Sequence, residues 1–361
     1  TKTLHLRHTR LDHRIDWAGA ALLSLSLVPL LLVAEQGREW GWGSTNAIIC
    51  YVIGVVAAIG FFWQEHRMGE EAILPLAMFR NKTVGVASIA SVLIGVAMFG
   101  GLAALPLYLQ IVKGATPTEA GLLLLPMTLG IMIGSILSGQ IISRTGRYRV
   151  FPIVGSALLT ISLFIFHYVA YDTPLWQTMI VMTMFGVGLG FNFQPLTLAV
   201  QNAVPPQQIG VATSTATFTR QIGGTLGTAV FLSILFSTAS EKITTALAAA
   251  VPTQEFQAAL ADPANAAVAE QFAAAQSGGG AATSVLSDSS FLTGLDERLA
   301  KPFLIGFSEA MDLVFLTGSA VMVLGFLVML MLPNVELRKS ASYGQRENDG
   351  APSDADAAND V

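Results

Sequence analysis

One arginine, Arg220, lies in an apolar stretch, residues 209–236, that holds no other charged residue. If this stretch is a helix from residue 209, Arg220 lies ~16 Å along it, near the centre of a bilayer whose hydrocarbon core is about 30 Å thick. An arginine at that depth costs roughly 2.5–3.5 kcal/mol to insert, so its side chain must face protein or water. Thr217, one turn earlier, and Gln221, the next residue, are polar neighbours.

Two roles for Arg220 stay open. In the first, which the rarity of idle charges inside membranes favours, Arg220 lines a central cavity and contacts a substrate or a coupling carboxylate. Its face of the helix would then be a polar, small-residue stripe that includes Thr213, Thr217, Gly224 and Gly227. In the second, the guanidinium bonds to backbone carbonyls and only holds neighbouring helices together.

Two carboxylates and three amides complete the candidate site. Glu309 and Asp312 lie one helical turn apart at the start of the last apolar stretch, and two carboxylates at this spacing can hold a proton or a cation between them. Alternatively, they mark an exposed helix start, where acids suit the positive end of the helix dipole. The uncharged cavity candidates are Asn192, Gln194 and Gln110, although amides inside membranes join helices as often as they bind substrates.

A short basic loop joins two apolar stretches at residues 139–149 and includes Gly139, Ser143, Arg144, Gly146 and Arg147. Positively charged loops of this length are retained in the cytoplasm, so this loop is expected on that side. We expect Gly146 to adopt a positive φ in the turn and Gly139 to let two helices approach closely. Within the preceding stretch, residues 130, 134 and 138 are small and four apart, which predicts a face for close helix packing.

Composition places the chain among membrane proteins. Hydrophobic residues make up 53% of the 361 and charged residues 12%, against about 25% charged in soluble domains. The single cysteine, Cys50, excludes an internal disulfide framework and a cysteine-based metal centre. Because the sequence has no Walker-type loop, no G-x-S-x-G elbow and no metal-ligand spacing, we expect neither an enzyme nor a cofactor, metal or nucleic-acid partner. Energy would come from an ion gradient and not from ATP.

The apolar stretches predict an all-α membrane protein with eight transmembrane helices. Each expected span has at least the roughly 17 residues that are needed to cross a bilayer. The spans cover residues 17–34, 47–63, 84–112, 118–142, 150–169, 176–200, 209–236 and 304–332. They divide the chain into a basic loop (1–16), two added helices (17–63), an interfacial segment (64–82), a six-helix unit (83–337) and a disordered tail (338–361).

The distribution of basic residues predicts the orientation. With the first loop in the cytoplasm, 13 of the 19 lysines and arginines fall on the cytoplasmic side and five on the other, while Arg220 stays within the membrane. This bias follows the positive-inside rule and places both ends of the chain in the cytoplasm, in a bacterial-type plasma membrane.

Residues 238–303 form the one long hydrophilic segment, which this topology places outside the membrane. The segment holds seven acidic residues and three basic ones, and we expect short, partly ordered helices in it. It could concentrate cationic substrates or dock a partner at the outer face. Equally, it could be an insertion without a role, because long surface loops cost little free energy.

The basic loop resembles the G-x-x-x-D-R-x-G-R signature of the major facilitator superfamily, with Ser143 in place of the aspartate. That signature lies between the second and third helices of a six-helix half, which makes the first two spans additional. Two helices added between two halves resemble the fourteen-helix drug:proton antiporter family. Three further segments resemble it: Ile15-Asp16-Trp17-Ala-Gly, Leu74-Pro-Leu-Ala-Met-Phe-Arg80-Asn and Arg220-Gln-Ile-Gly-Gly224, so the likeness extends over residues 11–335.

The resemblance implies a proton-coupled exporter of amphipathic, often cationic, drugs that works by alternating access. Its partners would be the substrate, protons, the lipid bilayer and an N-terminal six-helix half of the same polypeptide, which would carry the usual acidic proton site. Two alternatives stay open: an exporter of a lipid or lipid precursor, and a membrane scaffold without transport activity.

Overall fold

The computed structural model describes residues 16–69, 72–74, 76–265 and 295–334, and these residues form helices and turns without a strand. The predicted basic loop before Asp16, the middle of the acidic segment and the predicted tail lie outside the described residues. The α-helices are α1 (Trp17–Trp40), α2 (Thr45–Met68), α3 (Lys82–Leu107), α4 (Pro117–Leu123), α5 (Leu125–Thr145), α6 (Val150–Phe166), α7 (Leu175–Asn202), α8 (Ile209–Ala250), α9 (Gln254–Leu260) and α12 (Glu297–Leu330). Shorter turns are η2 (Leu76–Arg80), η3 (Tyr108–Val112), η4 (Pro206–Gln208) and η5 (Pro263–Asn265).

Within the described residues, six helical segments are long and apolar enough to cross a membrane. They are Thr45–Met68, Lys82–Val112, Pro117–Thr145, Leu175–Asn202, Pro206–Ala250 and Glu297–Leu330. Two shorter apolar helical segments, Trp17–Val33 and Val150–Phe166, coincide with the other two predicted spans. The prediction of an all-α membrane protein is therefore confirmed.

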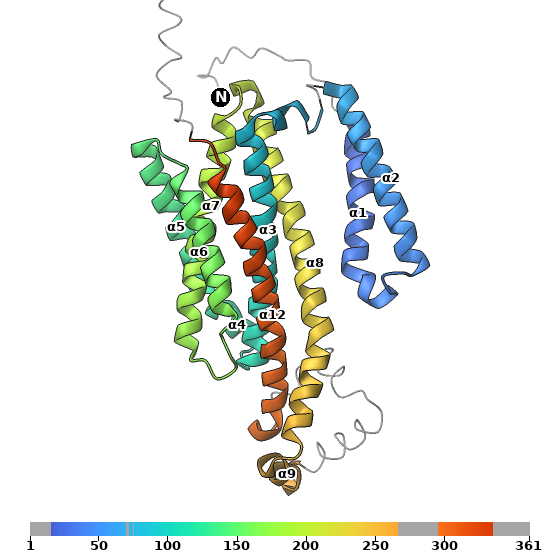
Figure 1. Cartoon of the computed structure of the whole chain (residues 1–361), viewed down its shortest axis with the longest axis vertical. Helices are drawn as coiled ribbons and strands as arrows, with labels where there is room; N and C mark the ends of the chain where they lie inside the picture. Colours follow the sequence, from blue (N-terminus) through green and yellow to red (C-terminus); the bar gives the residue numbers. More distant parts are fainter. Residues whose placement is uncertain (1–15, 70–71, 75, 266–294, 335–361) are drawn as a thin grey trace, which may run out of the picture.

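The first two helices form a hairpin that lies beside α8 in Figure 1. Side chains cap both helix starts: Asp16 accepts a hydrogen bond from the Gly19 amide of α1, and Ser44 accepts one from the Ala47 amide of α2. The two helices pack closely at Gly54, where an added Cβ atom would lie only 2.5 Å from the Leu30 side chain.

The remaining long helices form a bundle in which glycines bring helix backbones together. A Cβ atom on Gly130 or Gly134 of α5 would lie 2.5 or 2.7 Å from a carbonyl oxygen of α7, which confirms the predicted small-residue face. On the other side of α7, Gly95 of α3 packs against the backbone of α8. Gly139 differs from its prediction, because no atom of the described residues lies within 4 Å of its Cβ position. The described helices therefore make no close approach at this position.

Two helices extend further than the apolar stretches predicted. The predicted seventh span ends at residue 236, whereas α8 continues without a break to Ala250, and α12 begins at Glu297 instead of near residue 304. Ala239, Ile243 and Leu247 are buried and four residues apart, so they form a stripe along α8. This stripe packs on α12, where Gly306 meets the backbone of Ile243. Both ends of the segment expected to hold short helices therefore belong to long ones, which stabilise each other, whereas α9 between them is a short helix as expected. Both long helices extend beyond the rest of the bundle in Figure 1.

Candidate substrate and coupling site

Arg220 lies in the middle third of the apolar part of α8, on the side that faces α7. Its guanidinium carbon lies 5.0 Å from the centre of the Phe193 ring of α7, in a cation–π contact. The side chain is half-buried and forms no hydrogen bond or ion pair with another described residue. The backbone of Arg220 packs against Gly95 of α3, so three helices fix the position of this cation.

The exposed polar side chains nearest to Arg220 in sequence are Thr217 and Gln221 on α8, while Gln194 follows Phe193 on α7. The Thr217 hydroxyl donates to the Thr213 carbonyl one turn earlier, which leaves its oxygen free to accept another hydrogen bond. These residues could present a cation, two amides and a hydroxyl beside an aromatic face. Gly224 and Gly227 are buried against α3, so the predicted polar stripe divides into an exposed part and a packed part.

Asn192 points away from this group. The side chain is fully buried, its Nδ2 donates to the Gly188 carbonyl at 2.7 Å, and Nδ2 also lies next to Gly155 of α6. Its Oδ1 has no hydrogen-bond partner in the described part of the chain. Asn192 thus lies between α6 and α7, and its contacts are those of an amide that joins two helices.

Gln110 lies apart from Arg220 as well, in the π-helical turn η3 that ends the α3 span. A π-helical turn widens the helix by one residue, and such turns are frequent at functional sites. Next to it, Tyr108 is buried and donates to the Ala170 carbonyl, while Lys113 donates to the carbonyls of Tyr171 and Thr173, both at 2.7 Å. Burial lowers the pKa of Lys113. These contacts tie the end of α3 to the turn between α6 and α7.

The basic loop between α5 and α6 is anchored to the end of α12. Gly146 ends α5 with φ 69°, as predicted. The buried Tyr148 hydroxyl donates to the Pro333 carbonyl at 3.2 Å, and Arg149 Nη2 donates to the Leu330 carbonyl at 2.9 Å. Ser143, Arg144 and Arg147 are exposed. Tyr148 and Arg149 are therefore structural anchors, and the count of basic residues could not distinguish Arg149 from the other arginines of the loop.

Glu309 and Asp312 differ in their surroundings, although both lie on α12. Glu309 Oε2 forms an ion pair with Lys242 Nζ of α8 at 3.3 Å, and both side chains are about half exposed. Asp312 is half-buried, and its Oδ1 has no hydrogen-bond partner in the described residues. The His167 ring Nδ1 lies 3.2 Å from the backbone carbonyl of Asp312. The sequence could not indicate Lys242 or His167 as neighbours, because neither is close to α12 along the chain.

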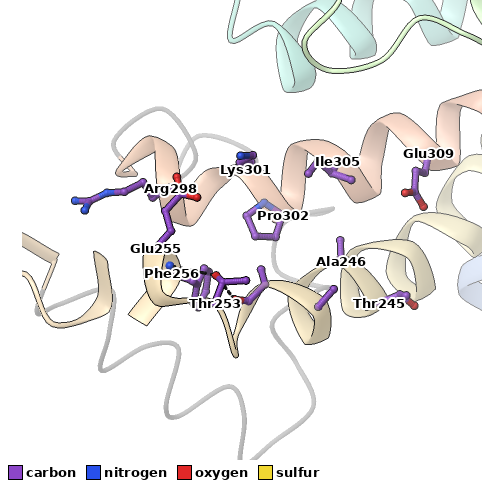
Figure 2. A pocket seen from close by; sticks show the side chains of 12 residues that line it. Thr245, Ala246, Thr253, Glu255, Phe256, Arg298, Lys301, Pro302, Ile305 and Glu309 are labelled. Carbon is purple, nitrogen blue, oxygen red and sulfur yellow. Dashed lines mark hydrogen bonds between the residues drawn. The ribbon is translucent and has the colours of Figure 1, made fainter. Parts of the chain in front are cut away.

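A pocket of about 350 Å³ lies between the extensions of α8 and α12 and is closed at one end by α9. Figure 2 shows Glu309 at one end of the pocket, with Thr245 and Ala246 of α8 opposite. At its other end, Arg298 forms ion pairs with Asp296 and Asp262. The hydrogen bonds from Arg298 hold the pKa of Asp296 well below its usual range.

Comparison with known proteins identifies related chains. Residues 17–228 match the family model described as Major Facilitator Superfamily. A tetracycline resistance determinant of Streptomyces rimosus is 37% identical over 325 residues, which is 89% of this chain and 92% of that protein. An uncharacterized MFS-type transporter of Mycobacterium tuberculosis is 32% identical over 90% of this chain and 43% of its own length. Multidrug resistance protein 3 of Bacillus subtilis is 33% identical over 58% of this chain and 41% of its own length. The chain thus aligns with less than half of the length of the last two relatives.

Proposed function

Because the chain belongs to the major facilitator superfamily, a family of membrane transporters, we propose that it is the C-terminal part of a proton-coupled exporter of amphipathic drugs. The predicted likeness to drug exporters of this superfamily is supported by the names of the Streptomyces and Bacillus relatives. The export cycle would be alternating access, in which this six-helix unit rocks against a second half around a cavity at the centre of the membrane. A proton gradient supplies the energy, and no cofactor takes part.

Arg220 carries this proposal. A cation in the middle of a membrane helix costs free energy unless it has a partner, yet within the described residues the guanidinium of Arg220 is stabilised by the ring of Phe193 and by no ion pair. An amphipathic molecule offers what this place lacks: an apolar body for the aromatic face and oxygen atoms for the five donors of the guanidinium. Thr217, Gln221 and Gln194 add hydrogen-bonding groups that are exposed on the same two helices.

The proposed orientation follows the basic residues. The loop with Arg144 and Arg147 would face the cytoplasm of a bacterial-type plasma membrane, and the extensions of α8 and α12 would stand on the outer side. Both ends of the chain would then be cytoplasmic. The outer segment between the two extensions could also dock a partner by its charge, in keeping with its excess of acidic residues.

The test is efflux of tetracycline and of ethidium by the full-length polypeptide in cells whose proton gradient can be collapsed. Arg220→Ala should abolish export while the protein stays in the membrane in unchanged amount, and Arg220→Lys should restore only part, because a point charge replaces a planar fork of donors. If the Ala variant disappears from the membrane, Arg220 serves structure and the proposal loses its main support.

Other outcomes separate the remaining alternatives. Export of a labelled lipid precursor without export of either drug would indicate the lipid exporter. A protein without any export that co-purifies with a partner would indicate the scaffold.

A further inference from the structure

Asp312 lies near the end of the membrane opposite the basic loop. It precedes the end of α12 at Leu330 by ~27 Å, close to the full thickness of a hydrocarbon core. Its Oδ1 is buried, and no described residue donates a hydrogen bond to it. A carboxylate oxygen without a donor loses its hydration and gains nothing in return, whereas a protonated carboxyl carries no charge to solvate.

The charges close enough to act on Asp312 come from three helices and partly cancel. They are His167 at the end of α6, Lys242 on α8 and Glu309 on α12 itself. Lys242 is already paired with Glu309 at 3.3 Å. From the α3 side, the buried Tyr108 hydroxyl is close enough for the charge of Asp312 to act on it, and that hydroxyl already donates to the Ala170 carbonyl. Lys242 is therefore not a dedicated cation of Asp312, and His167 is the other basic group that acts on Asp312 within the described residues.

Further buried polar groups lie around this place. Thr178 of α7 is fully buried, and its hydroxyl lies within hydrogen-bonding reach of the Tyr108 hydroxyl. The buried Oδ1 of Asp312 has no partner in the described residues, and buried polar atoms of this kind are rare in folded proteins. Asp312 Oδ1 is therefore the polar atom at this place that the described part of the chain leaves unsatisfied.

The pocket between the helix extensions ends next to this place, at Glu309. Glu309 lines the pocket and is about half exposed (Figure 2). Asp312 follows it by one helical turn on α12, on the side away from the pocket. Along α12, Glu309 with its partner Lys242 therefore comes between the other pocket-lining residues of this helix and Asp312. A proton that enters from this end meets Glu309 first and Asp312 next.

We propose that Asp312 is a proton-binding residue of the exporter and that the Lys242–Glu309 pair forms its entrance from the side opposite the basic loop. This inference rests on the proposed proton-coupled export and names the residue in this half that would carry the proton. In the binding step, a hydronium ion transfers its proton to a carboxylate oxygen of Asp312. One O–H bond forms, one water molecule is left, and the bundle becomes neutral at this place. The step requires no other reactant.

Tetracycline binding to the purified full-length protein, measured between pH 5 and pH 8, tests the inference. If one proton competes with the drug, the affinity of the wild-type protein falls by about tenfold per pH unit on the acidic side. Asp312→Asn should bind tetracycline with an affinity that no longer depends on pH, and Asp312→Glu should restore the dependence. The matched control is Glu241→Gln, which removes an exposed carboxylate next to Lys242 and should leave the pH profile unchanged.

The outcomes separate this inference from the proposed function. A wild-type affinity that does not depend on pH would overturn proton coupling itself, whereas a pH dependence that persists in Asp312→Asn would overturn only the role of Asp312. Labelling of the wild-type protein with dicyclohexylcarbodiimide, which modifies protonated carboxyls in apolar surroundings, gives a readout that requires no variant. Mass spectrometry should find the label on Asp312 and reduced labelling with tetracycline bound; a label on Glu309 alone contradicts the inference.

Discussion

Gly134→Ala tests the close packing of α5 on α7. A Cβ atom at this position would lie 2.7 Å from the Val187 carbonyl oxygen, whereas ordinary contact begins at about 3.4 Å. The two helices must therefore separate by roughly 0.7 Å, and overpacking of this kind costs about 1–3 kcal/mol. Gly121→Ala is the matched control, because it lies earlier in the same membrane span and no atom lies within 4 Å of its Cβ position.

The comparison of these two variants isolates the steric cost, because the gain in helix propensity from glycine to alanine is common to both. We expect the free energy of unfolding of Gly134→Ala to be lower than that of Gly121→Ala by about 1–3 kcal/mol. In detergent, heating followed by size-exclusion chromatography should show a lower midpoint, by about 2–4 °C for each kcal/mol in a domain of this size. Equal midpoints would refute the packing argument.

Two further predictions concern the loop between α5 and α6 and the start of α12. With Cys50 replaced, Arg147→Cys should react with an impermeant thiol reagent only in inverted vesicles, and labelling in intact cells would contradict the proposed topology. Arg147 suits this test because its side chain is exposed, whereas the neighbouring Tyr148 is 1% exposed and a cysteine there would be shielded from the reagent. At the start of α12, the depressed pKa of Asp296 means that its capping contribution is present above the ordinary pKa of an aspartate and is lost as the pH falls toward the folded-state value. The protection of the Leu299 and Ala300 amides, taken as the intrinsic exchange rate divided by the observed rate at each pH, should therefore fall in strong acid, and an equal fall in Asp296→Asn would contradict this.

The membrane segments could be predicted from the sequence because a bilayer sets a minimum apolar length and excludes most charges. The ends of the last two helices could not be predicted in this way. Ala239, Ile243 and Leu247 are apolar residues spaced among polar ones, and their burial depends on the partner helix α12. Beyond the hydrocarbon, α8 and α12 stabilise each other by ordinary burial in water, which a transmembrane window does not detect.

The candidate site was predictable in its chemistry and less so in its geometry. The cost of burying a charge identified Arg220, but its contact with Phe193 depends on how α7 and α8 cross. Asn192 and Gln194 lie two residues apart on one helix, so they face different directions, and only Gln194 is exposed. Likewise, Glu309 and Asp312 are one turn apart, but only Glu309 forms the ion pair with Lys242 among the described residues, so the two carboxylates have different surroundings.

The length of α8 has a mechanical consequence. Its 42 residues make a rod of ~63 Å, about twice the thickness of a hydrocarbon core, and the 34 residues of α12 run beside it for ~51 Å. A rigid rod amplifies rotation at its free end: a tilt of about 10° within the membrane displaces a tip ~30 Å away by roughly 5 Å. A small change in the tilt of the membrane helices therefore produces a large displacement at the tips of the paired extensions. A distance probe attached near Ala250 would detect that displacement outside the membrane.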